Sequence, residues 1–368
     1  MFETYPLPSL TIEQAKRLQF KVVDSITHYF NGYEILSDGD LGVVLGLNRP
    51  AFTQKAECVL AEIFDTEAAA LVRGSGTGAI RQGLMTFLKP GDKLLVHKAP
   101  IYETTHVTLD SMGIARVEAD YNDTDDILRA IDGNPDLAGA LVQITRQKID
   151  DKYHHDEVIA AIKKSRPGLP VMTDDNYAAM KIEKIGVQCG ADLSAFSCFK
   201  LQGPVGVGVV LGKSERIKRI HQFNYSGGSQ VQGHEALDVL RGLCVAPVML
   251  AIQAQVNEEL VERLNSGEIP QVKRAFLANA QSKVLLVEFK EDIAEKLLKI
   301  TPNCGAAAHP VGAESKYEIV PMIYRISGTF RAADPTLEKR MIRINPMRSG
   351  PDTILRILRD AIAEAEKL

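Results

Sequence analysis

The sequence predicts an α/β protein in which helices cover both faces of a mostly parallel, seven-stranded sheet, followed by a smaller C-terminal α+β domain. The chain has 368 residues, which exceeds the roughly 100–200 residues of a usual single domain. Residues 51–212 alternate short apolar runs with helical patterns, as expected for parallel strands joined by crossover helices. After residue 265 the pattern changes to a few strands mixed with helices. These three observations together predict the two-domain arrangement.

Seven apolar runs are expected to form the sheet. They are AAALV (68–72), KLLVH (93–97), ARVEAD (115–120), GALVQI (139–144), PVMTD (170–174), LSAFSCF (193–199) and VGVVLG (207–212). Between several of these runs, helical patterns occupy 52–64, 77–88, 123–132 and 155–164. Buried runs separated by helices predict a sheet that is covered on both faces.

The expected domain boundaries follow from these patterns. Residues 1–50 form an N-terminal arm that packs on the small domain or on a dimer partner. Residues 51–265 form the large domain, which ends in one long helix over 234–264, and residues 266–368 form the small domain. In the small domain we expect strands at KVLLVEF, YEIVPMIYRIS and MIRIN, and helices near 290–299 and 352–367.

Composition excludes several classes of function. The 43 Lys and Arg residues against 47 Asp and Glu give a net charge of −4, so neither a nucleic-acid footprint nor a polybasic membrane patch is indicated. The N-terminus lacks the pattern of a secretory signal, and we find no apolar run of membrane-spanning length. Five scattered cysteines without a C-x-x-C pair indicate reduced thiols and no metal site. We therefore expect a cytoplasmic enzyme or binding protein.

The glycine-rich loop RGSGTGAI (73–80) is the first candidate for ligand binding. Ligands of open α/β sheets bind beyond the carboxyl ends of the strands, and glycines before a helix N-terminus let backbone N–H groups approach an anion. The loop also fits the loose dinucleotide pattern G-x-G-x-x-G/A, but the following strand ends in His97 and Lys98 rather than in an acidic residue. A phosphate site is therefore favoured over a dinucleotide site, and a purely structural turn is the other alternative.

Three further strand ends carry informative side chains. Tyr102 follows the strand at 93–97 and could stack on an aromatic ligand or simply pack. Two adjacent aspartates, Asp174 and Asp175, end the strand at 170–174, so that one can face a site while the other caps a turn. Lys200 lies between an apolar run and a Gly/Pro-rich stretch. A poorly hydrated lysine has a lowered pKa and can form a Schiff base, whereas a surface lysine is the simpler alternative.

These signals fit one cofactor together. Pyridoxal 5'-phosphate needs a lysine for its aldehyde, donors for its phosphate and a carboxylate that keeps the pyridine nitrogen protonated, so that the ring accepts electrons. Asp175 and Lys200 end strands that could be neighbours in the sheet.

At this point the chain resembles the fold-type-I pyridoxal-phosphate enzymes, in the superfamily of aminotransferases and of lyases of Cys/Met metabolism. More narrowly, it is similar to the bacterial YhfS-like group, whose expected activity is transamination. The motifs that carry the likeness include GTGAIR, TDDNYA, FSCFK, YSGGSQ, VGAESKYEI and IRINP. The resemblance implies a large domain like that of aspartate aminotransferase.

The resemblance also implies the roles of individual residues. Lys200 is the Schiff-base lysine, Asp175 is the partner of the pyridine nitrogen, and Arg343 binds the substrate carboxylate. The remaining cofactor contacts come from phosphate ligands, a stacking tyrosine and a residue at the ring: Gly76, Thr77, Gly78, Ser197, Tyr102 and Gln143. Ser226 and Gly227 are expected to reach the phosphate of a partner subunit.

Three departures from the lyase pattern bear on the reaction. Tyr177 and Phe199 stand where the lyases have threonine, and QITRQ (143–147) replaces their Glu-Ser-Pro-Gly. Within that segment, Gln143 and Arg146 are placed at the hydroxyl side of the ring. Cys198 is interpreted as strand packing and His97 is not assigned to catalysis, because no partner spacing supports it.

The favoured function is therefore a cytoplasmic, homodimeric or tetrameric aminotransferase that acts on an amino acid and a keto acid. The first alternative is a C–S lyase performing β- or γ-elimination, or a racemase, with the same cofactor. A non-catalytic ligand sensor and a nicotinamide-dependent dehydrogenase are the alternatives from other classes.

Overall fold

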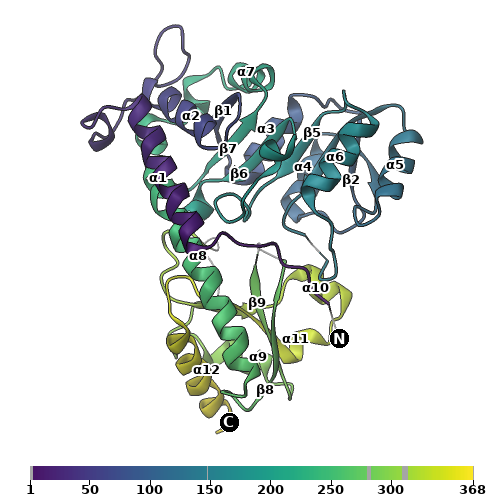
Figure 1. Cartoon of the computed structure of the whole chain (residues 1–368), viewed down its shortest axis with the longest axis vertical. Helices are drawn as coiled ribbons and strands as arrows, with labels where there is room; N and C mark the ends of the chain where they lie inside the picture. The colour runs from purple at the N-terminus through teal and green to yellow at the C-terminus, as the bar shows by residue number, and fades with distance from the viewer. Residues whose placement is uncertain (1–2, 147, 280–282, 309–313, 368) are drawn as a thin grey trace.

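The computed structural model describes residues 3–146, 148–279, 283–308 and 314–367. It contains a seven-stranded sheet and a separate four-stranded sheet, joined along one side by the long helix α8 (Gly233–Asn265) (Figure 1). The predicted fold class is confirmed: a mostly parallel α/β sheet is followed by a smaller domain with its own sheet.

The large sheet has the strand order β1-β7-β6-β5-β4-β2-β3. All neighbouring strands are parallel except for β7, which runs antiparallel to both β1 and β6. The strands are β1 (Ala68–Arg73), β2 (Lys93–His97), β3 (Ala115–Ala119), β4 (Leu137–Gln143), β5 (Val171–Asp174), β6 (Leu193–Ser197) and β7 (Val207–Gly212). The carboxyl ends of the six strands other than β7 therefore lie along one edge of the sheet.

Helices cover both faces of this sheet. Strands such as β5, β6 and β7 are therefore buried at every position. One face packs against α3, α4 and α7, and the other against α2, α8, α5 and α6. The helices are α2 (Ala51–Ile63), α3 (Ser75–Met85), α4 (Glu103–Ser111), α5 (Thr124–Asp132), α6 (His155–Ser165) and α7 (Ser214–Phe223). Short 3-10 turns η1 (Glu34–Leu36), η2 (Gly186–Cys189), η3 (Phe199–Leu201) and η4 (Gly227–Ser229) complete this part of the chain.

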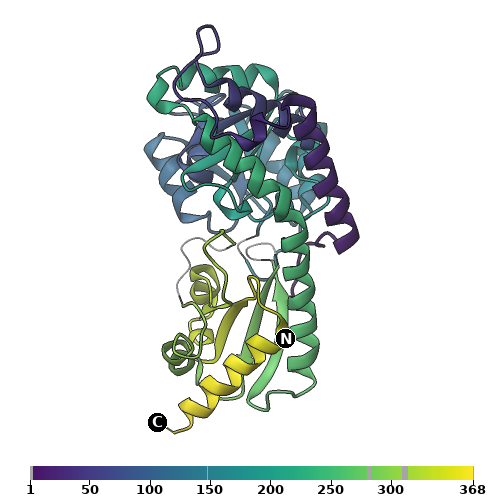
Figure 2. The same ribbon diagram turned by 90° about the vertical axis from the view of Figure 1, so that its left-hand side faces the viewer.

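The small domain is built on the antiparallel sheet β10-β11-β9-β8. Its apolar core is formed by α9, α12 and the end of α8 on one face, and α10 and α11 cover the other (Figure 2). The elements are β8 (Val272–Ala278), β9 (Val284–Phe289), α9 (Ala294–Ile300), β10 (Met322–Arg325), α10 (Gly328–Ala333), α11 (Leu337–Arg340), β11 (Met341–Asn345) and α12 (Pro351–Ala365). The sequence predicts three of these strands, and β8 is the strand that it does not reveal.

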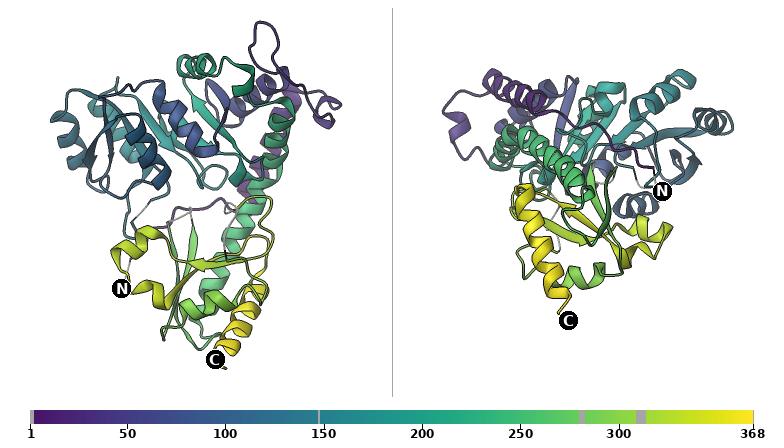
Figure 3. Two further views of the ribbon diagram at one scale, coloured as in Figure 1. Left: turned by 180° about the vertical axis from the view of Figure 1, so that it is seen from behind. Right: turned by 60° about the horizontal axis from the view of Figure 1, so that its bottom comes forward.

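The N-terminal segment contains a regular helix, α1 (Ile12–Tyr29), where an arm was expected. Thr11 and Gln14 form a capping box at its start, and Ala15, Val22 and Ile26 are buried. The helix lies beside α8 (Figures 1 and 3). Before it, the chain crosses toward the small domain, where the hydroxyl of Thr4 donates to the carbonyl of Leu277.

Helix α8 is long and apolar enough to cross a membrane by length and composition. However, 61% of its most apolar window is buried inside the protein. This burial is what a core helix requires, since α8 contributes to the cores of both domains.

Candidate active site

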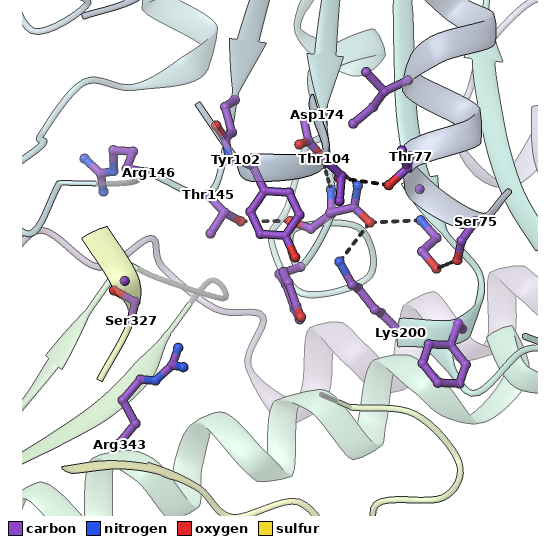
Figure 4. A pocket seen from close by; sticks show the side chains of 18 residues that line it. Ser75, Thr77, Tyr102, Thr104, Thr145, Arg146, Asp174, Lys200, Ser327 and Arg343 are labelled. Carbon is purple, nitrogen blue, oxygen red and sulfur yellow. Dashed lines mark hydrogen bonds between the residues drawn. The ribbon is translucent and has the colours of Figure 1, made fainter. Parts of the chain in front are cut away.

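A cavity of about 420 Å³ opens at the carboxyl edge of the large sheet, facing the small domain. Its walls come from the start of α3, the ends of β4, β5 and β6, the segment before α4, and three small-domain residues, Ser327, Gly328 and Arg343 (Figure 4). Most of the predicted site residues lie here: Gly76, Thr77, Tyr102, Gln143, Ser197, Lys200 and Arg343. Residues far apart in the sequence therefore meet in one place.

The first turn of α3 forms one end of the cavity. Gly74 has a φ of +94° and Ser75 a φ of +59°, and this left-handed bend turns the chain from β1 into the helix. The amides of Gly76 and Thr77 belong to the first turn, where N–H groups have no partner within the helix. The hydroxyls of Ser75 and Ser197 share a hydrogen bond of 2.8 Å. Amides and hydroxyls at a helix N-terminus suit a phosphate group.

Gly76 and Gly78 both lack a side chain because other atoms occupy the space, but those atoms differ. A Cβ on Gly76 would lie 2.6 Å from Oδ1 of Asn176, so this glycine makes room for a side chain of the cavity wall. A Cβ on Gly78 would lie 2.1 Å from the carbonyl oxygen of Arg73, and its N–H donates to Gly74. The prediction that Gly78 binds the phosphate is therefore corrected: it is a packing glycine inside the strand–helix turn.

Asn176 connects the two ends of the cavity. Its Oδ1 accepts hydrogen bonds from the backbone N–H of Ser197 at 3.1 Å and from Nζ of Lys200 at 3.2 Å. Its Nδ2 donates to Oδ1 of Asp174 at 2.7 Å. The Asn176 carbonyl in turn accepts from the hydroxyl of Thr145 at 2.8 Å. Sequence reasoning missed Asn176, although its place within the D-N-Y motif pointed to it.

The amine of Lys200 faces the cavity and is poorly hydrated. Nζ lies 3.9 Å from the centre of the Tyr177 ring. Burial lowers the pKa of Lys200 to about 8, against the opposing attraction of Asp174 and Glu314. A lysine with such a pKa can take up and release a proton near neutral pH.

The two adjacent aspartates have opposite roles from those predicted. Asp174 lines the cavity (Figure 4), where it accepts the hydrogen bond from Nδ2 of Asn176, and burial raises its pKa. Asp175 is fully buried and accepts hydrogen bonds from the N–H groups of Gly186 at 2.9 Å and Ala195 at 3.2 Å. Burial raises the pKa of Asp175 to about 6. Successive residues of an extended chain point to opposite sides, so Asp174, and not Asp175, presents its carboxylate to a ligand.

Two arginines line the cavity, but they are arranged differently. Arg343, on β11, donates from Nε to the carbonyl of Arg325 at 3.0 Å and stacks 4.1 Å from the centre of the Tyr324 ring. Its guanidinium points toward the cavity (Figure 4). Arg146 is buried, and its guanidinium donates to the carbonyls of Tyr153 and Tyr5. Arg146 therefore ties the N-terminal segment to the large domain.

The remaining predicted residues are placed as follows. Tyr102 precedes α4 and is half exposed at the cavity wall, near Thr104, whose hydroxyl accepts from that of Thr77 at 2.9 Å. His97 instead bonds Asp151 through Nε2 at 3.0 Å, away from the cavity lining. Gln147 and the first three residues of VGAESKYEI lie outside the described residues.

Ser226 and Gly227 do not line this cavity. They lie at the short turn η4, where Ser226 is exposed and a Cβ on Gly227 would contact Val43. A contribution to a partner's phosphate stays a prediction, because it concerns a second chain.

The residues of the cavity fit pyridoxal phosphate. The phosphate would be held by Ser75, Ser197 and the first amides of α3, and Asp174 would hold the ring nitrogen. Tyr102 would cover the ring and Lys200 would bind its aldehyde. A buried carboxylate, a lysine of lowered pKa and a helix N-terminus converge on one cavity, which is the donor set that this cofactor requires. Among the described residues, no cluster of His, Cys, Asp or Glu could hold a metal ion.

Comparison with known protein families supports this cofactor. A model described as Cys/Met metabolism PLP-dependent enzyme matches residues 50–289, and the YhfS-like C-terminal domain matches residues 258–358. The protein YhfS of Escherichia coli (strain K12) is 54% identical over 362 residues, covering 98% of this chain and 99% of that protein. A crystal structure of YhfS from Escherichia coli, described as pyridoxal-5'-phosphate dependent, superposes with a TM-score of 0.96 and covers 99% of this chain and all of that one.

More distant relatives carry lyase names. An L-methionine gamma-lyase of Pseudomonas putida is 26% identical over 214 residues, which is 55% of this chain and 52% of that protein. A cystathione gamma-lyase from Micromonospora echinospora shares the fold, with a TM-score of 0.73 at 18% identity, and covers 94% of this chain and 99% of that one. Neither of these names is that of an aminotransferase, so the expected transamination stays a prediction.

Proposed function

Because the chain belongs to the family of pyridoxal-phosphate-dependent enzymes of Cys/Met metabolism, we propose that it is a carbon–sulfur lyase. It would remove a sulfur-bearing group from the β- or γ-carbon of an amino acid. The lyase names of the L-methionine gamma-lyases that it resembles support this choice. When bound, the cofactor supplies an electron sink for the negative charge left at the substrate α-carbon.

The observation that carries the proposal is the place of the Lys200 amine in the cavity, with a lowered pKa. An elimination needs a base that takes the α-proton and an acid that protonates the departing sulfur, and one lysine amine can do both in turn. The amine of Lys200 lies in the cavity, bonded at 3.2 Å to Asn176. With a pKa of about 8, roughly a tenth of it is uncharged at pH 7, about 300-fold more than for an ordinary lysine.

The cavity supplies one guanidinium for a substrate carboxylate. Arg343 is turned into the cavity, and the contacts described for its guanidinium are to the carbonyl of Arg325 and to the ring of Tyr324. A guanidinium can pair with a carboxylate through two parallel hydrogen bonds. The guanidinium of Arg146 is engaged by the carbonyls of Tyr153 and Tyr5. This arrangement favours a substrate with a single carboxylate over the dicarboxylic acceptors of many transaminations.

The test is a screen of amino acids for release of ammonia, a keto acid and a thiol, with and without an added acceptor keto acid. A lyase forms the keto acid and the thiol without an acceptor. Keto-acid formation that depends fully on the acceptor would instead establish transamination. A Lys200→Ala variant is the control for turnover, and a Lys164→Ala variant, at an exposed site on α6, is the matched control for removal of a lysine.

The enzyme is further proposed to be a cytoplasmic homodimer in which Ser226 and Gly227 approach the phosphate of the partner. Large apolar side chains in the same region are exposed, including Leu41 at 76%, Leu45 at 101% and Tyr225 at 72%. Contiguous exposed apolar surface is typical of an interaction site. Analytical ultracentrifugation of the wild type and of a Leu45→Glu variant tests this: dissociation of the variant supports the interface, and an unchanged dimer contradicts it.

A further inference from the structure

Tyr177 is a strained residue at the cavity wall that the proposed reaction does not yet use. Its φ is +65°, in the left-handed region that a bulky side chain occupies only at a cost. The chain around it is fixed in this conformation: the carbonyl of Asn176 accepts from Thr145, and the carbonyl of Asp175 accepts from the amides of Ala178 and Ala179. Strain that the surroundings enforce is a reason to look for a function at that residue.

The strained backbone aims the ring of Tyr177 between the two domains. On one side the ring packs with the small-domain residues Met322, Tyr324 and Met347. Toward the large domain, Nζ of Lys200 lies 3.9 Å from the ring centre. An ammonium at this distance from an aromatic face is attracted by the ring quadrupole.

A second lysine near the same ring is already neutralised. Nζ of Lys181 lies 5.5 Å from the centre of the Tyr177 ring, but it forms a buried ion pair with Glu314. Glu314 also accepts a hydrogen bond from Gln253 at 3.2 Å. The ring is therefore left to the amine of Lys200, whose other polar contact is Asn176.

From this geometry we propose that Tyr177 is a positioning residue, whose ring face and Asn176 together hold the amine of Lys200 in one place in the cavity. The inference rests on the proposed role of Lys200 and not on whether the reaction is an elimination. Without the ring the four-carbon stem of lysine gains rotamer freedom, and its amine spends less time at the reacting position. The hydroxyl of Tyr177 is not required for this role.

The other charged groups near the amine set the background for a test. They are Asp174 on β5, Lys181 after β5 and Glu314 from the small domain, with Arg343 and Tyr102 across the cavity. All of these groups stay in the chain when Tyr177 is substituted, and Tyr177→Phe, which keeps the ring over both lysines, separates the effect of the ring on the Lys200 titration from that of the hydroxyl.

The experiment measures the pKa of Lys200 in the full-length chain without cofactor, by trace labelling with acetic anhydride across a pH series and mass spectrometry of the labelled peptide. Lys290, which is exposed, is the internal reference. Tyr177→Phe keeps the ring, whereas Tyr177→Leu and Tyr177→Met replace it by apolar chains of similar burial. Because the ring favours the charged amine, the ringless variants are expected to lower the Lys200 pKa by about one unit, and Tyr177→Phe to leave it unchanged.

Each outcome decides the matter. A wild-type pKa in the ringless variants would overturn the proposal, and an equal fall in Tyr177→Phe would overturn it in favour of the hydroxyl. Should Tyr177→Leu not fold, Tyr177→Met carries the same comparison. With cofactor, the ringless variants are expected to show a kcat about tenfold or more below that of the wild type at a little changed KM. Tyr177→Phe is expected to keep the wild-type kcat. Since labelling reads the free amine, failure of the lyase assignment would leave this result standing.

Discussion

A single methyl group at Gly76 is expected to disable the site. The added Cβ of a Gly76→Ala variant would lie 2.6 Å from Oδ1, 2.7 Å from Nδ2 and 3.0 Å from Cγ of Asn176, so Asn176 must move. That side chain bonds Lys200, Ser197 and Asp174. Loss of three hydrogen bonds at about 1 kcal/mol each, or overpacking at about 1–3 kcal/mol, makes about 1–3 kcal/mol the expected local cost.

The expected functional result is a fall in kcat of about 100-fold, because a displacement of about 1 Å at a reacting group has this effect. A loss of stability in Gly76→Ala would be informative, because Gly76 lies in helix α3. Replacement of a helical glycine by alanine normally stabilises a helix by about 1 kcal/mol. Turnover and thermal unfolding are measured on the same preparations.

A matched substitution separates the clash from the general effect of alanine. Gly168 lies in the turn between α6 and β5, and a Cβ added there would meet nothing within 4 Å, so Gly168→Ala is expected to keep full activity. By contrast, Gly78→Ala would meet the carbonyl oxygen of Arg73 at 2.1 Å and should lower the melting temperature. Retention of near wild-type kcat by Gly76→Ala would refute the assignment of Asn176 as the side chain that orients Lys200.

Three more predictions test the charged groups. Asp174→Asn should lower turnover about 100-fold or more, whereas Asp175→Asn should lower the melting temperature, because an amide nitrogen cannot accept from the backbone amide that it would face, and should keep most of the turnover per folded molecule; equal losses of turnover per folded molecule would contradict the reversed assignment. Turnover should rise with pH to a plateau above pH 8, because the Lys200 amine accepts a proton only when it is uncharged and its pKa is about 8; a flat profile from pH 6 to 9 would disagree. Arg343→Lys should raise KM for the amino acid about 10–100-fold through loss of the bidentate pair, measured by steady-state kinetics.

The central strands of the large sheet, such as β5, β6 and β7, could be predicted from the sequence because they are buried on both faces and read as nearly continuous apolar runs. All seven expected runs correspond to strands. The same signal weakens where an element is partly exposed, as in the edge strand β3, of which only Ala119 is buried, and it fails for two other elements. Strand β8 begins with the two charged residues Lys273 and Arg274 after Val272, and α4 is a polar helix with only three of its nine residues buried. Neither shows the hydrophobic periodicity on which such a prediction depends.

The error at Asp175 has a different physical origin. Every residue of β5 is buried, so the strand offers no alternation of polar and apolar positions from which to read which side chain faces the ligand. The D-N motif of the resembling lyases then selected Asp175. Only the contacts of the folded chain, with two backbone amides donating to Asp175, separate a structural carboxylate from one that is available to a ligand.

The small domain completes the electrostatics of a site that the large domain largely builds. Lys181 and Lys200 approach the same tyrosine ring, and two uncompensated ammonium groups in one poorly hydrated region would repel each other strongly. Glu314, which belongs to the C-terminal part of the chain, forms the ion pair that neutralises Lys181, and its backbone carbonyl accepts from Gln202 at 2.6 Å. Arg343 reaches the cavity from the same domain. Docking of the small domain therefore does two things at once: it brings a group for the substrate carboxylate, and it removes a competing charge from the surroundings of the reactive lysine.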